Sequence, residues 1–228
     1  MKTRRTPLGV WLPLAAFSLF VSMSHAQNLV INGNFNSGNT GFTSAYSYTT
    51  DLVPEFTYAI GTDPASFHNY TYTIGDHTTG TGNMMIVNPG STPGQAAWRQ
   101  TVGVTPNSIY NVSAWTMGWY VFEPVAADVR LQINGTPVGS DLVLNTPTDS
   151  AWKEFGGLWN SGTATSATIE IVDLQTALEG NDFSLDDVSM EAVPEPGSGV
   201  LLLGGAVALP LVRQGTRRVS ATTSRACQ

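Results

Sequence analysis

Short runs of alternating polar and apolar residues, separated by clusters of turn-forming residues, fill residues 27–192 and constrain the fold most. Thr, Ser, Asn, Gly, Val and aromatic residues dominate these runs, whereas patterns with a helical period are nearly absent. Alternation of this kind is typical of strands that bury one face. We therefore expect an all-β chain, folded as a single antiparallel β-sandwich.

Eleven segments in this region carry a strand pattern. They are Leu29–Asn32, Phe42–Thr49, Phe56–Ile60, Met84–Asn88, Ala96–Val104, Ile109–Tyr120, Val129–Asn134, Thr136–Gly139, Trp152–Trp159, Ala167–Val172 and Phe183–Glu191. Asn134-Gly135, between two such runs, predicts a two-residue hairpin because both residue types tolerate a positive φ. The region is long enough for one domain with a substantial core. No repeat of fixed period is present, which argues against solenoids and propellers.

The N-terminal segment, residues 1–26, has the pattern of a secretory signal peptide. Lys2, Arg4 and Arg5 precede an apolar run, and Ser24-His25-Ala26 fits a cleavage site with small residues. The arginine pair leaves both the general and the twin-arginine secretion route open. The mature chain is therefore predicted to begin at Gln27 and to act outside the cytoplasm.

The C-terminal segment, residues 193–228, has three ordered parts. The motif Val193-Pro194-Glu195-Pro196-Gly197 comes first, an apolar run follows at 200–212, and a tail containing Arg213, Arg217 and Arg218 fills 213–228. Two prolines within three residues favour an extended, accessible tether. An apolar run of this length gives about 20 Å of helix, less than the roughly 30 Å of a hydrocarbon core. A buried C-terminal helix is the alternative.

This arrangement resembles the PEP-CTERM sorting signal of Gram-negative bacteria. The resemblance implies an exosortase-type protease as a partner, which would process the chain at the 193–197 motif. It also implies a transient membrane tether through the apolar segment, followed by release to the cell envelope, the outer surface or the extracellular polysaccharide. The short apolar run favours a processing label over a permanent anchor.

The charge of residues 27–192, between these two segments, limits the classes of molecule that the domain could bind. It carries 16 acidic residues and only three basic ones, Arg99, Arg130 and Lys153, so its net charge is −13. Such a body repels nucleic acid and anionic membranes, and it suits neutral polymers or divalent cations. The single cysteine, Cys227, lies in the tail. Disulfides, cysteine-ligated zinc and a cysteine nucleophile are therefore excluded for the predicted mature domain.

Three segments of the domain resemble galactose-binding-like jelly rolls and carbohydrate-binding modules of that shape. The opening Asn28-Leu29-Val30-Ile31-Asn32-Gly33-Asn34-Phe35-Asn36 is similar to their first strand, and Asp182-Phe183-Ser184-Leu185-Asp186-Asp187-Val188-Ser189-Met190 is similar to their last. The loop from Gly75 to Met84, which contains Asp76-His77-Thr78, resembles a loop of MAM-type jelly rolls and of many exported PEP-CTERM proteins. The resemblance implies a jelly-roll sandwich that binds carbohydrate.

The same resemblance implies a structural Ca²⁺ between the first and last strands. Its candidate ligands are Asn34, Asn36, Asp76, Asp186 and Asp187, since Ca²⁺ prefers oxygen atoms. The alternative is that these side chains are solvated or cap turns. Neighbouring residues of a strand point to opposite faces, so Asp186 and Asp187 are not expected to form a catalytic pair. For Asp76-His77 a loop-building role is favoured over a general base or a metal ligand.

Aromatic residues suggest the binding surface. Trp115 and Trp119 share one face of the predicted strand 109–120 and would lie ~13 Å apart, a spacing that suits two sugar subsites. Arg130 and Gln132 could bind sugar hydroxyls. The alternative is that both tryptophans fill a second layer of the sandwich or pack under the loop 121–127.

Taken together, these patterns predict an exported, non-catalytic carbohydrate-binding module. A structural matrix protein without a defined ligand is the main alternative. A polysaccharide hydrolase is the third reading, although no carboxylate pair is singled out by its position in the sequence.

Overall fold

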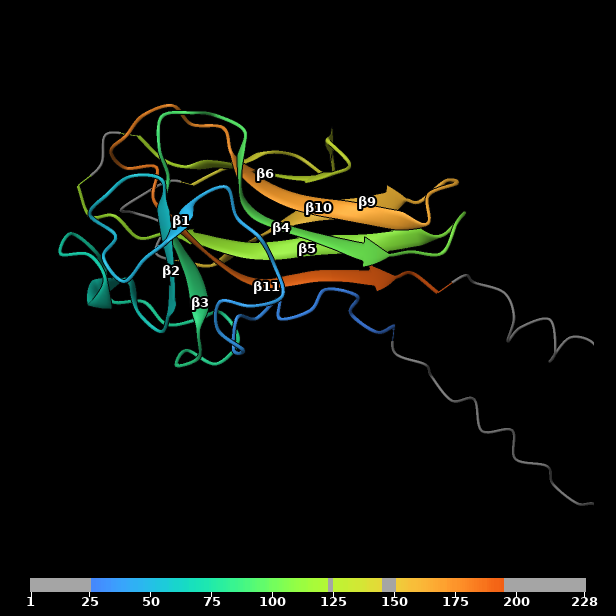
Figure 1. Cartoon of the computed structure of the whole chain (residues 1–228), viewed down its shortest axis with the longest axis horizontal. Helices are drawn as coiled ribbons and strands as arrows, with labels where there is room; N and C mark the ends of the chain where they lie inside the picture. Colours follow the sequence, from blue (N-terminus) through green and yellow to red (C-terminus); the bar gives the residue numbers. More distant parts are fainter. Residues whose placement is uncertain (1–25, 123–124, 145–150, 195–228) are drawn as a thin grey trace, which may run out of the picture. The chain divides into compact units, whose positions relative to one another are not determined.

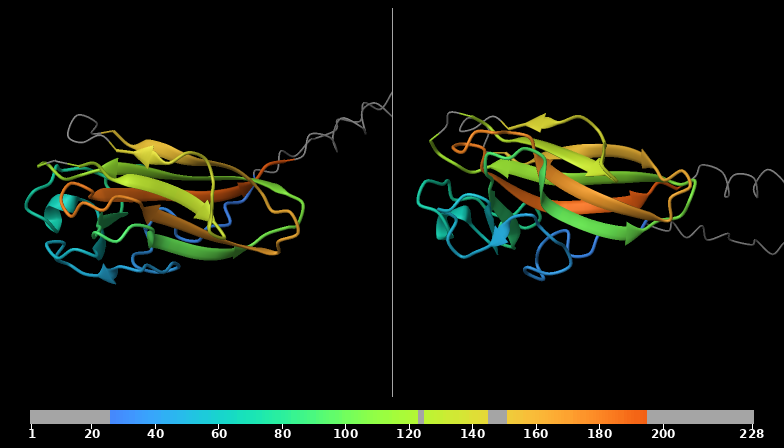
Figure 2. Two further views of the ribbon diagram at one scale, coloured as in Figure 1. Left: turned by 90° about the horizontal axis from the view of Figure 1, so that it is seen from above. Right: turned by 45° about the horizontal axis from the view of Figure 1, so that its top comes forward.

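The computed structural model describes residues 26–122, 125–144 and 151–194, and Ala26–Pro194 form one compact unit. Two β-sheets pack face to face (Figures 1 and 2), so the expected all-β sandwich of jelly-roll type is confirmed. The predicted signal peptide up to His25 and the sorting segment beyond Pro194 lie outside the described residues. Within the described residues, no helix is both long enough and apolar enough to cross a membrane.

The first sheet has six strands in the order β1-β2-β3-β11-β5-β9. All neighbours are antiparallel except β1 and β2, which are parallel. The strands are β1 (Ser47–Tyr48), β2 (Thr57–Gly61), β3 (Met84–Asn88), β11 (Phe183–Ala192), β5 (Ile109–Gly118) and β9 (Lys153–Asn160).

The second sheet runs β4-β10-β6-β7, and β8 pairs with the other end of β6. Its strands are β4 (Gln95–Gly103), β10 (Ser166–Asp173), β6 (Asp128–Ile133), β7 (Thr136–Pro137) and β8 (Leu142–Val143). Asn134 and Gly135 join β6 to β7 with φ of 52° and 77°, so the predicted hairpin is confirmed.

The main core fills the space between the two sheets. Alternate residues of each strand point inward, and Trp98, Leu131, Ile169 and Phe183 are almost fully buried there. Complete burial of one such side chain stabilises the fold by about 1.5–3 kcal/mol. The period-two pattern of the sequence therefore corresponds to this shared apolar layer.

A second apolar cluster covers part of the outer face of the first sheet. Met84 and Ile86 of β3, together with Met117 and Trp119, pack there beneath residues from the long segment 62–83. That segment includes only one short helix, the 3₁₀ turn η1 (Pro64–Ser66), which Asp63 caps by accepting a hydrogen bond from the Ala65 backbone N–H. Both faces of the sheet are consequently apolar near this segment.

The predicted strand Leu29–Asn32 is wrong, and Phe42–Thr49 and Thr136–Gly139 are strands only in part. Leu29–Asn32 forms no strand, because Asn28 Oδ1 accepts hydrogen bonds from both Val30 and Met190 N–H groups, and Asn32 has a φ of 57°. The segment still lies beside β11, since Leu29 N–H donates to the Met190 carbonyl oxygen at 2.9 Å. Of Phe42–Thr49, only Ser47–Tyr48 is a strand, together with one bridge between Thr43 and Arg99.

Candidate functional site

A β-bulge in β11 changes the expected relation between Asp186 and Asp187. The pairing of β11 with β5 shifts register between Asp186 and Ser189, and Asp187 has a φ of 47°. A bulge places one extra residue on the strand, so alternation is interrupted there. The expectation that the two carboxylates face opposite ways is wrong, because both contact the same loop.

That loop contains His77 and Thr78. Asp186 Oδ2 accepts hydrogen bonds from the backbone N–H groups of His77 at 2.8 Å and Thr78 at 3.3 Å. Asp187 Oδ2 lies 2.7 Å from His77 Nδ1, and its Oδ1 accepts from Thr78 Oγ1 at 2.7 Å. Asp186 is fully buried, and desolvation raises its pKa to about 6. The paired carboxylates therefore fasten the loop to the sheet.

Asp76 and His77 complete this arrangement. Asp76 accepts hydrogen bonds from the backbone N–H groups of Thr79 and Gly82 at 3.0 and 2.7 Å. Burial acts to raise the Asp76 pKa, but these hydrogen bonds outweigh burial and lower it. The His77 ring stacks on Trp115, with centroids 3.8 Å apart and planes 14° from parallel. These contacts match a loop-building role for both residues.

The side chains of the five candidate calcium ligands accept hydrogen bonds from N–H and O–H groups of the protein, which is the role of turn caps and not of ligands to a cation. The oxygens of Asp76, Asp186 and Asp187 accept from N–H or O–H groups, and Asn36 Oδ1 accepts from the Asn83 N–H at 3.1 Å. Asn34 Oδ1 accepts from the Asn36 N–H at 3.3 Å. In the described part of the chain, no group of three His, Cys, Asp or Glu side chains could hold a metal ion. These hydrogen bonds favour the alternative, in which the side chains cap turns, and a test of calcium binding follows in the Discussion.

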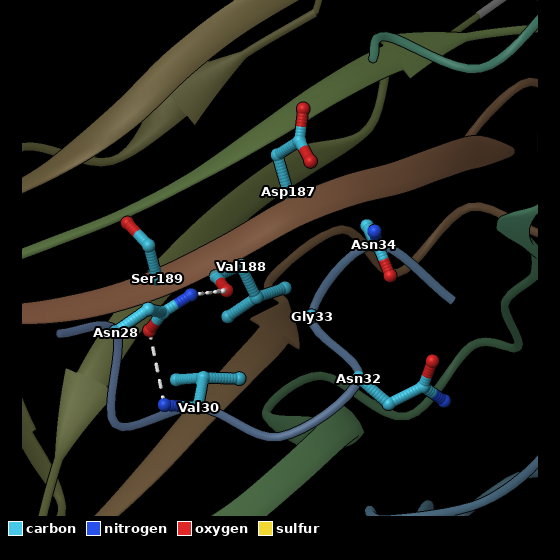
Figure 3. Close-up of a pocket in the computed structure, with 8 residues that line it drawn as sticks. All are labelled: Asn28, Val30, Asn32, Gly33, Asn34, Asp187, Val188 and Ser189. Carbon is cyan, nitrogen blue, oxygen red and sulfur yellow. Dashed lines mark hydrogen bonds between the residues drawn. The ribbon is translucent and has the colours of Figure 1, made fainter. Parts of the chain in front are cut away.

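A small polar pocket of about 320 Å³ lies between the N-terminal segment and β11 (Figure 3). Figure 3 shows the Asp187 carboxylate pointing away from Asn32, so the two side chains do not converge. The lining residues are Asn28, Val30, Asn32, Gly33, Asn34, Asp187, Val188 and Ser189. Backbone contacts build this pocket, including the bond from Val188 N–H to the Gly33 carbonyl at 3.0 Å. We assign it no ligand.

The predicted tryptophan platform is wrong. Trp119 is fully buried in the second apolar cluster, because the segment 62–83 covers this end of the face. Trp115 is half-buried beneath the His77 ring. The alternative, that these tryptophans fill a second layer of the sandwich, describes their positions better.

Arg130 and Gln132 lie on the second sheet, whereas Trp115 belongs to the first, so these residues do not form one surface. Both belong to β6, where Arg130 makes a two-pronged ion pair with Asp141 at 2.7 and 2.6 Å. Gln132 Nε2 donates to Glu170 at 2.7 Å, and Glu170 also pairs with Arg99. These polar groups are satisfied by one another on the outer face of the second sheet. The four predicted ligand-binding residues are therefore not brought together.

A different group of side chains forms the most exposed aromatic surface of the described chain. We call it the aromatic end, and it consists of His68, Tyr70, Tyr120 and Phe122. Tyr70 is 52% exposed and Phe122 is 60% exposed, and their ring centroids lie 5.2 Å apart. Tyr120 touches both rings at 6.4 and 6.3 Å, and His68 lies 5.9 Å from Tyr120.

Backbone hydrogen bonds hold the aromatic end in shape. Tyr72 N–H donates to the Trp119 carbonyl, and Val121 N–H donates to the Tyr70 carbonyl, both at 3.1 Å. An isolated bridge between Thr71 and Tyr120 lies between these two bonds. The buried Trp119 ring supports the surface from below, 5.5 Å from His68. These bonds join the segment that carries Tyr70 to the segment that carries Tyr120.

The aromatic end lies far from where the chain enters and leaves the domain. In the β5–β11 pairing, Gly118 is opposite Phe183 at one end and Tyr110 is opposite Ala192 at the other. Strands of this length span about 30 Å. The loops after β5 and before β11 gather at one end of the sandwich in Figure 1, whereas β11 ends at Ala192 at the other.

Burial shifts the pKa values of Tyr120 and His68 in the aromatic end and of Glu55. Burial raises the pKa of Tyr120, and the charges of Glu179, Asp182 and Glu55 raise it further. Burial and the charge of Glu179 raise the pKa of Glu55 to about 7. His68 Nδ1 accepts a hydrogen bond from the Tyr70 N–H at 3.2 Å, which requires an unprotonated nitrogen. Burial lowers the His68 pKa, against the opposing effect of Asp51.

Sequence analysis did not single out His68, Tyr70 or Phe122. One available signal was the run Trp119-Tyr120-Val121-Phe122, which places three aromatic residues at the end of a predicted strand. Nothing in the sequence pairs that run with residues 68–72, because the two segments are joined only by tertiary hydrogen bonds.

Comparisons with known proteins show a shared fold. No family model matches the chain, and no curated protein matches it significantly. A cyclase from Fischerella sp. TAU is similar over 76% of this chain and 100% of its own, with 13% identity and a TM-score of 0.51. At that identity the likeness shows the β-sandwich fold alone.

Two sugar-binding structures are similar at lower TM-scores. The CBM22-1 xylan-binding domain of Paenibacillus barcinonensis Xyn10C matches 75% of this chain and 97% of its own, with 12% identity and a TM-score of 0.49. The C-terminal domain of the sugar-binding protein EclA matches 41% of this chain and 64% of its own, with 21% identity and a TM-score of 0.35.

Proposed function

We propose that this chain is an exported, non-catalytic module that binds polysaccharide through the aromatic end. The observation that carries the proposal is the pair of exposed rings, Tyr70 and Phe122, whose centroids lie 5.2 Å apart. Clustered aromatic rings at a surface are costly to leave in water, and such patches commonly mark binding sites. This surface replaces the predicted platform of Trp115 and Trp119.

The chemistry of the aromatic end suits a sugar ring. The apolar C–H face of a pyranose packs against an aromatic ring, while a phenol or carboxylate binds its hydroxyl groups. Tyr70 and Tyr120 supply phenols. Because the surface is open, binding is expected to be shallow and reversible.

The position of the aromatic end supports a role on an exported, tail-sorted protein. Its rings lie at the opposite end of the sandwich from Ala192, after which the sorting motif begins. In this proposal an exosortase-type protease processes the chain at Pro194-Glu195-Pro196, and the module then meets polysaccharide at the cell envelope or outside the cell. Replacement of all three motif residues by Ala is expected to retain the chain in the membrane fraction. Unchanged release on fractionation would contradict the sorting role.

Binding is tested with a glycan array and affinity electrophoresis, using the full chain and its Tyr70→Ala and Phe122→Ala variants. We expect at least one polysaccharide to be retained, and each variant to weaken retention about 2- to 10-fold, as loss of one aromatic contact does. Tyr48→Ala is the matched control, because Tyr48 is 50% exposed but packs on Tyr58 of β2.

Three results would overturn the proposal. An absence of binding to every glycan would favour a structural matrix protein. Binding unaffected by both variants would move the site elsewhere. Turnover of a polysaccharide that one carboxylate substitution abolishes would show a hydrolase.

A further inference from the structure

A cavity with no assigned ligand lies beside the aromatic end. Its volume is about 550 Å³, and it lies between residues 72–76, Gly80, Met117 of β5 and Trp152. The polar pocket of Figure 3 is smaller, at about 320 Å³. Binding sites for small molecules commonly measure about 300–1,000 Å³. The cavity is therefore large enough for a ligand with the size of a sugar ring.

The cavity and the aromatic end share two backbone segments. Thr71 forms a bridge with Tyr120, and the Tyr72 N–H donates to the Trp119 carbonyl oxygen at 3.1 Å. Tyr70 of the aromatic end and Tyr72 of the cavity are two residues apart, which is no more than about 7 Å of chain. A ligand that consists of linked rings can therefore reach both places.

Apolar side chains form the walls of the cavity. The Trp152 Nε1–H donates to the Gly75 carbonyl oxygen at 3.1 Å, so the loop satisfies the indole nitrogen. The His77 ring makes an edge-to-face contact with this half-buried indole, with centroids 6.0 Å apart and planes at 68°. Met117 lines the cavity but is only 2% exposed, which places it at the base. The C–H face of a sugar ring can pack on an indole and a thioether.

The polar groups of the cavity restrict the charge of its ligand. Within the described chain, neither the Tyr72 phenol nor the Thr73 hydroxyl has a hydrogen-bond partner. Asp76 also lines the cavity, but its carboxylate already accepts hydrogen bonds from Thr79 and Gly82. Among the described residues that line the cavity, none is basic. The groups that are free to bind a ligand are therefore neutral hydroxyls, which suit an uncharged sugar and offer no counter-charge to a uronate.

We propose that this cavity is a second subsite, which binds one uncharged sugar residue of a glycan that also contacts the aromatic end. This inference rests on the proposed function and specifies its ligand as a neutral chain of linked sugar rings. One sugar face packs on Trp152, and Tyr72 and Thr73 bind its hydroxyl groups. Tyr70 and Phe122 contact the neighbouring part of the same glycan.

The test is calorimetry on the full chain with five hexasaccharides. Four are neutral β-1,4-linked oligomers of glucose, xylose, mannose or N-acetylglucosamine, and the fifth is an oligomer of galacturonate. We expect at least one neutral hexamer to bind, and the galacturonate hexamer to bind more weakly. The methyl glycoside of the same neutral sugar should also bind more weakly than its hexamer, because it fills only one subsite at a time.

Two variants test the cavity itself. Tyr72→Phe removes one hydroxyl and is expected to lower the affinity for the neutral hexamer about 2- to 10-fold, as loss of one hydrogen bond does. Trp152→Ala removes the indole wall and should lower the affinity by a similar factor. Tyr48→Phe is the matched control for the first variant, because Tyr48 is 50% exposed and does not line the cavity. Thermal melts check each fold, and Tyr72→Phe still tests the subsite if Trp152→Ala does not fold.

The outcomes separate this inference from the proposed function. Weaker binding in Tyr70→Ala, with Tyr72→Phe and Trp152→Ala unchanged, would overturn the second subsite and keep the aromatic end. The opposite pattern would overturn the proposed function and leave the cavity as the binding site. Tighter binding of the galacturonate hexamer would overturn the choice of a neutral ligand. Failure of every hexamer would overturn the subsite alone if a glycan binds on the array, and both proposals if the array is blank.

Discussion

Replacement of the buried Asp173 by Asn should stabilise the domain at pH 8. Asp173 is 1% exposed, at the end of β10, and burial raises its pKa from 3.8 to about 6. Its Oδ1 accepts hydrogen bonds from the backbone N–H groups of Gln175 and Asp128, and its Oδ2 accepts from Asn181 Nδ2. An Asn at this position keeps the first two bonds. Asn181 can turn its amide, because its buried Oδ1 has no partner among the described residues.

The sign and size of the effect follow from proton linkage. A carboxyl with a raised pKa binds its proton more tightly in the folded state, so it adds stability below the unfolded pKa and loses it as pH rises through about 6. One pKa unit corresponds to about 1.4 kcal/mol, so the Asp173 contribution is at most about 3 kcal/mol. Between pH 8 and pH 4.5 it amounts to about 2 kcal/mol.

Other groups titrate in the same range. Burial raises the pKa of Asp186 to about 6, and burial together with Glu179 raises that of Glu55 to about 7, so both add stability on acidification. His68 acts in the opposite direction, because burial lowers its pKa and its protonation disfavours the folded state. We expect the parent chain to become more stable as pH falls from 8 to 4.5.

The assay is urea unfolding followed by tryptophan fluorescence, for the parent and Asp173→Asn at pH 8, 6 and 4.5. We expect the variant to be more stable at pH 8 by up to about 3 kcal/mol, and this difference to shrink to about 1 kcal/mol at pH 4.5. General charge repulsion would give parent and variant the same dependence on pH. Equal stability at pH 8, or a less stable variant there, would refute the reasoning.

Three further predictions concern the loop, the N-terminal segment and calcium. His77→Ala removes the stack on Trp115 and should lower stability by about 1–2 kcal/mol in urea unfolding, with a matching loss of near-UV circular dichroism; an unchanged unfolding midpoint would argue against loop fastening. Gly33→Ala should cost at least about 2 kcal/mol, because an added Cβ would lie 2.0 Å from the Val188 carbonyl oxygen, whereas Gly103→Ala has open space and should change little. Since the adjacent carboxylates of β11 already accept hydrogen bonds, melts in calcium and in EDTA should coincide, and a calcium-dependent rise of several degrees would restore the predicted site.

Much of the fold was predictable because strand patterns are local. Met84–Asn88 matches its strand residue for residue, and β4, β5 and β11 lie within two residues of their predicted bounds. The segment before Gly33 was not predictable in this way. Polar and apolar residues do alternate in this segment. However, the N–H groups of Val30 and Met190 donate to the Asn28 side chain and are not available for a strand ladder.

Less of the candidate site was predictable. Asp76 and His77 were expected to build a loop, but the carboxylates that receive this loop were expected on opposite faces. The bulge at Asp187 reversed that relation. A positive φ at an Asp within a strand does not change the alternation of polar and apolar residues around it, so no sequence pattern indicated the bulge.

The amino-acid sequence alone determined that this chain is all-β, acidic and free of cysteine over residues 27–192, and that a hairpin turns at Asn134-Gly135. These properties depend on composition and on residues that are neighbours in the chain. Only the tertiary structure decided that Trp119 is buried while Tyr70 and Phe122 are exposed. Burial depends on what packs from elsewhere, and here the segment 62–83 covers one aromatic residue while bringing another to the surface.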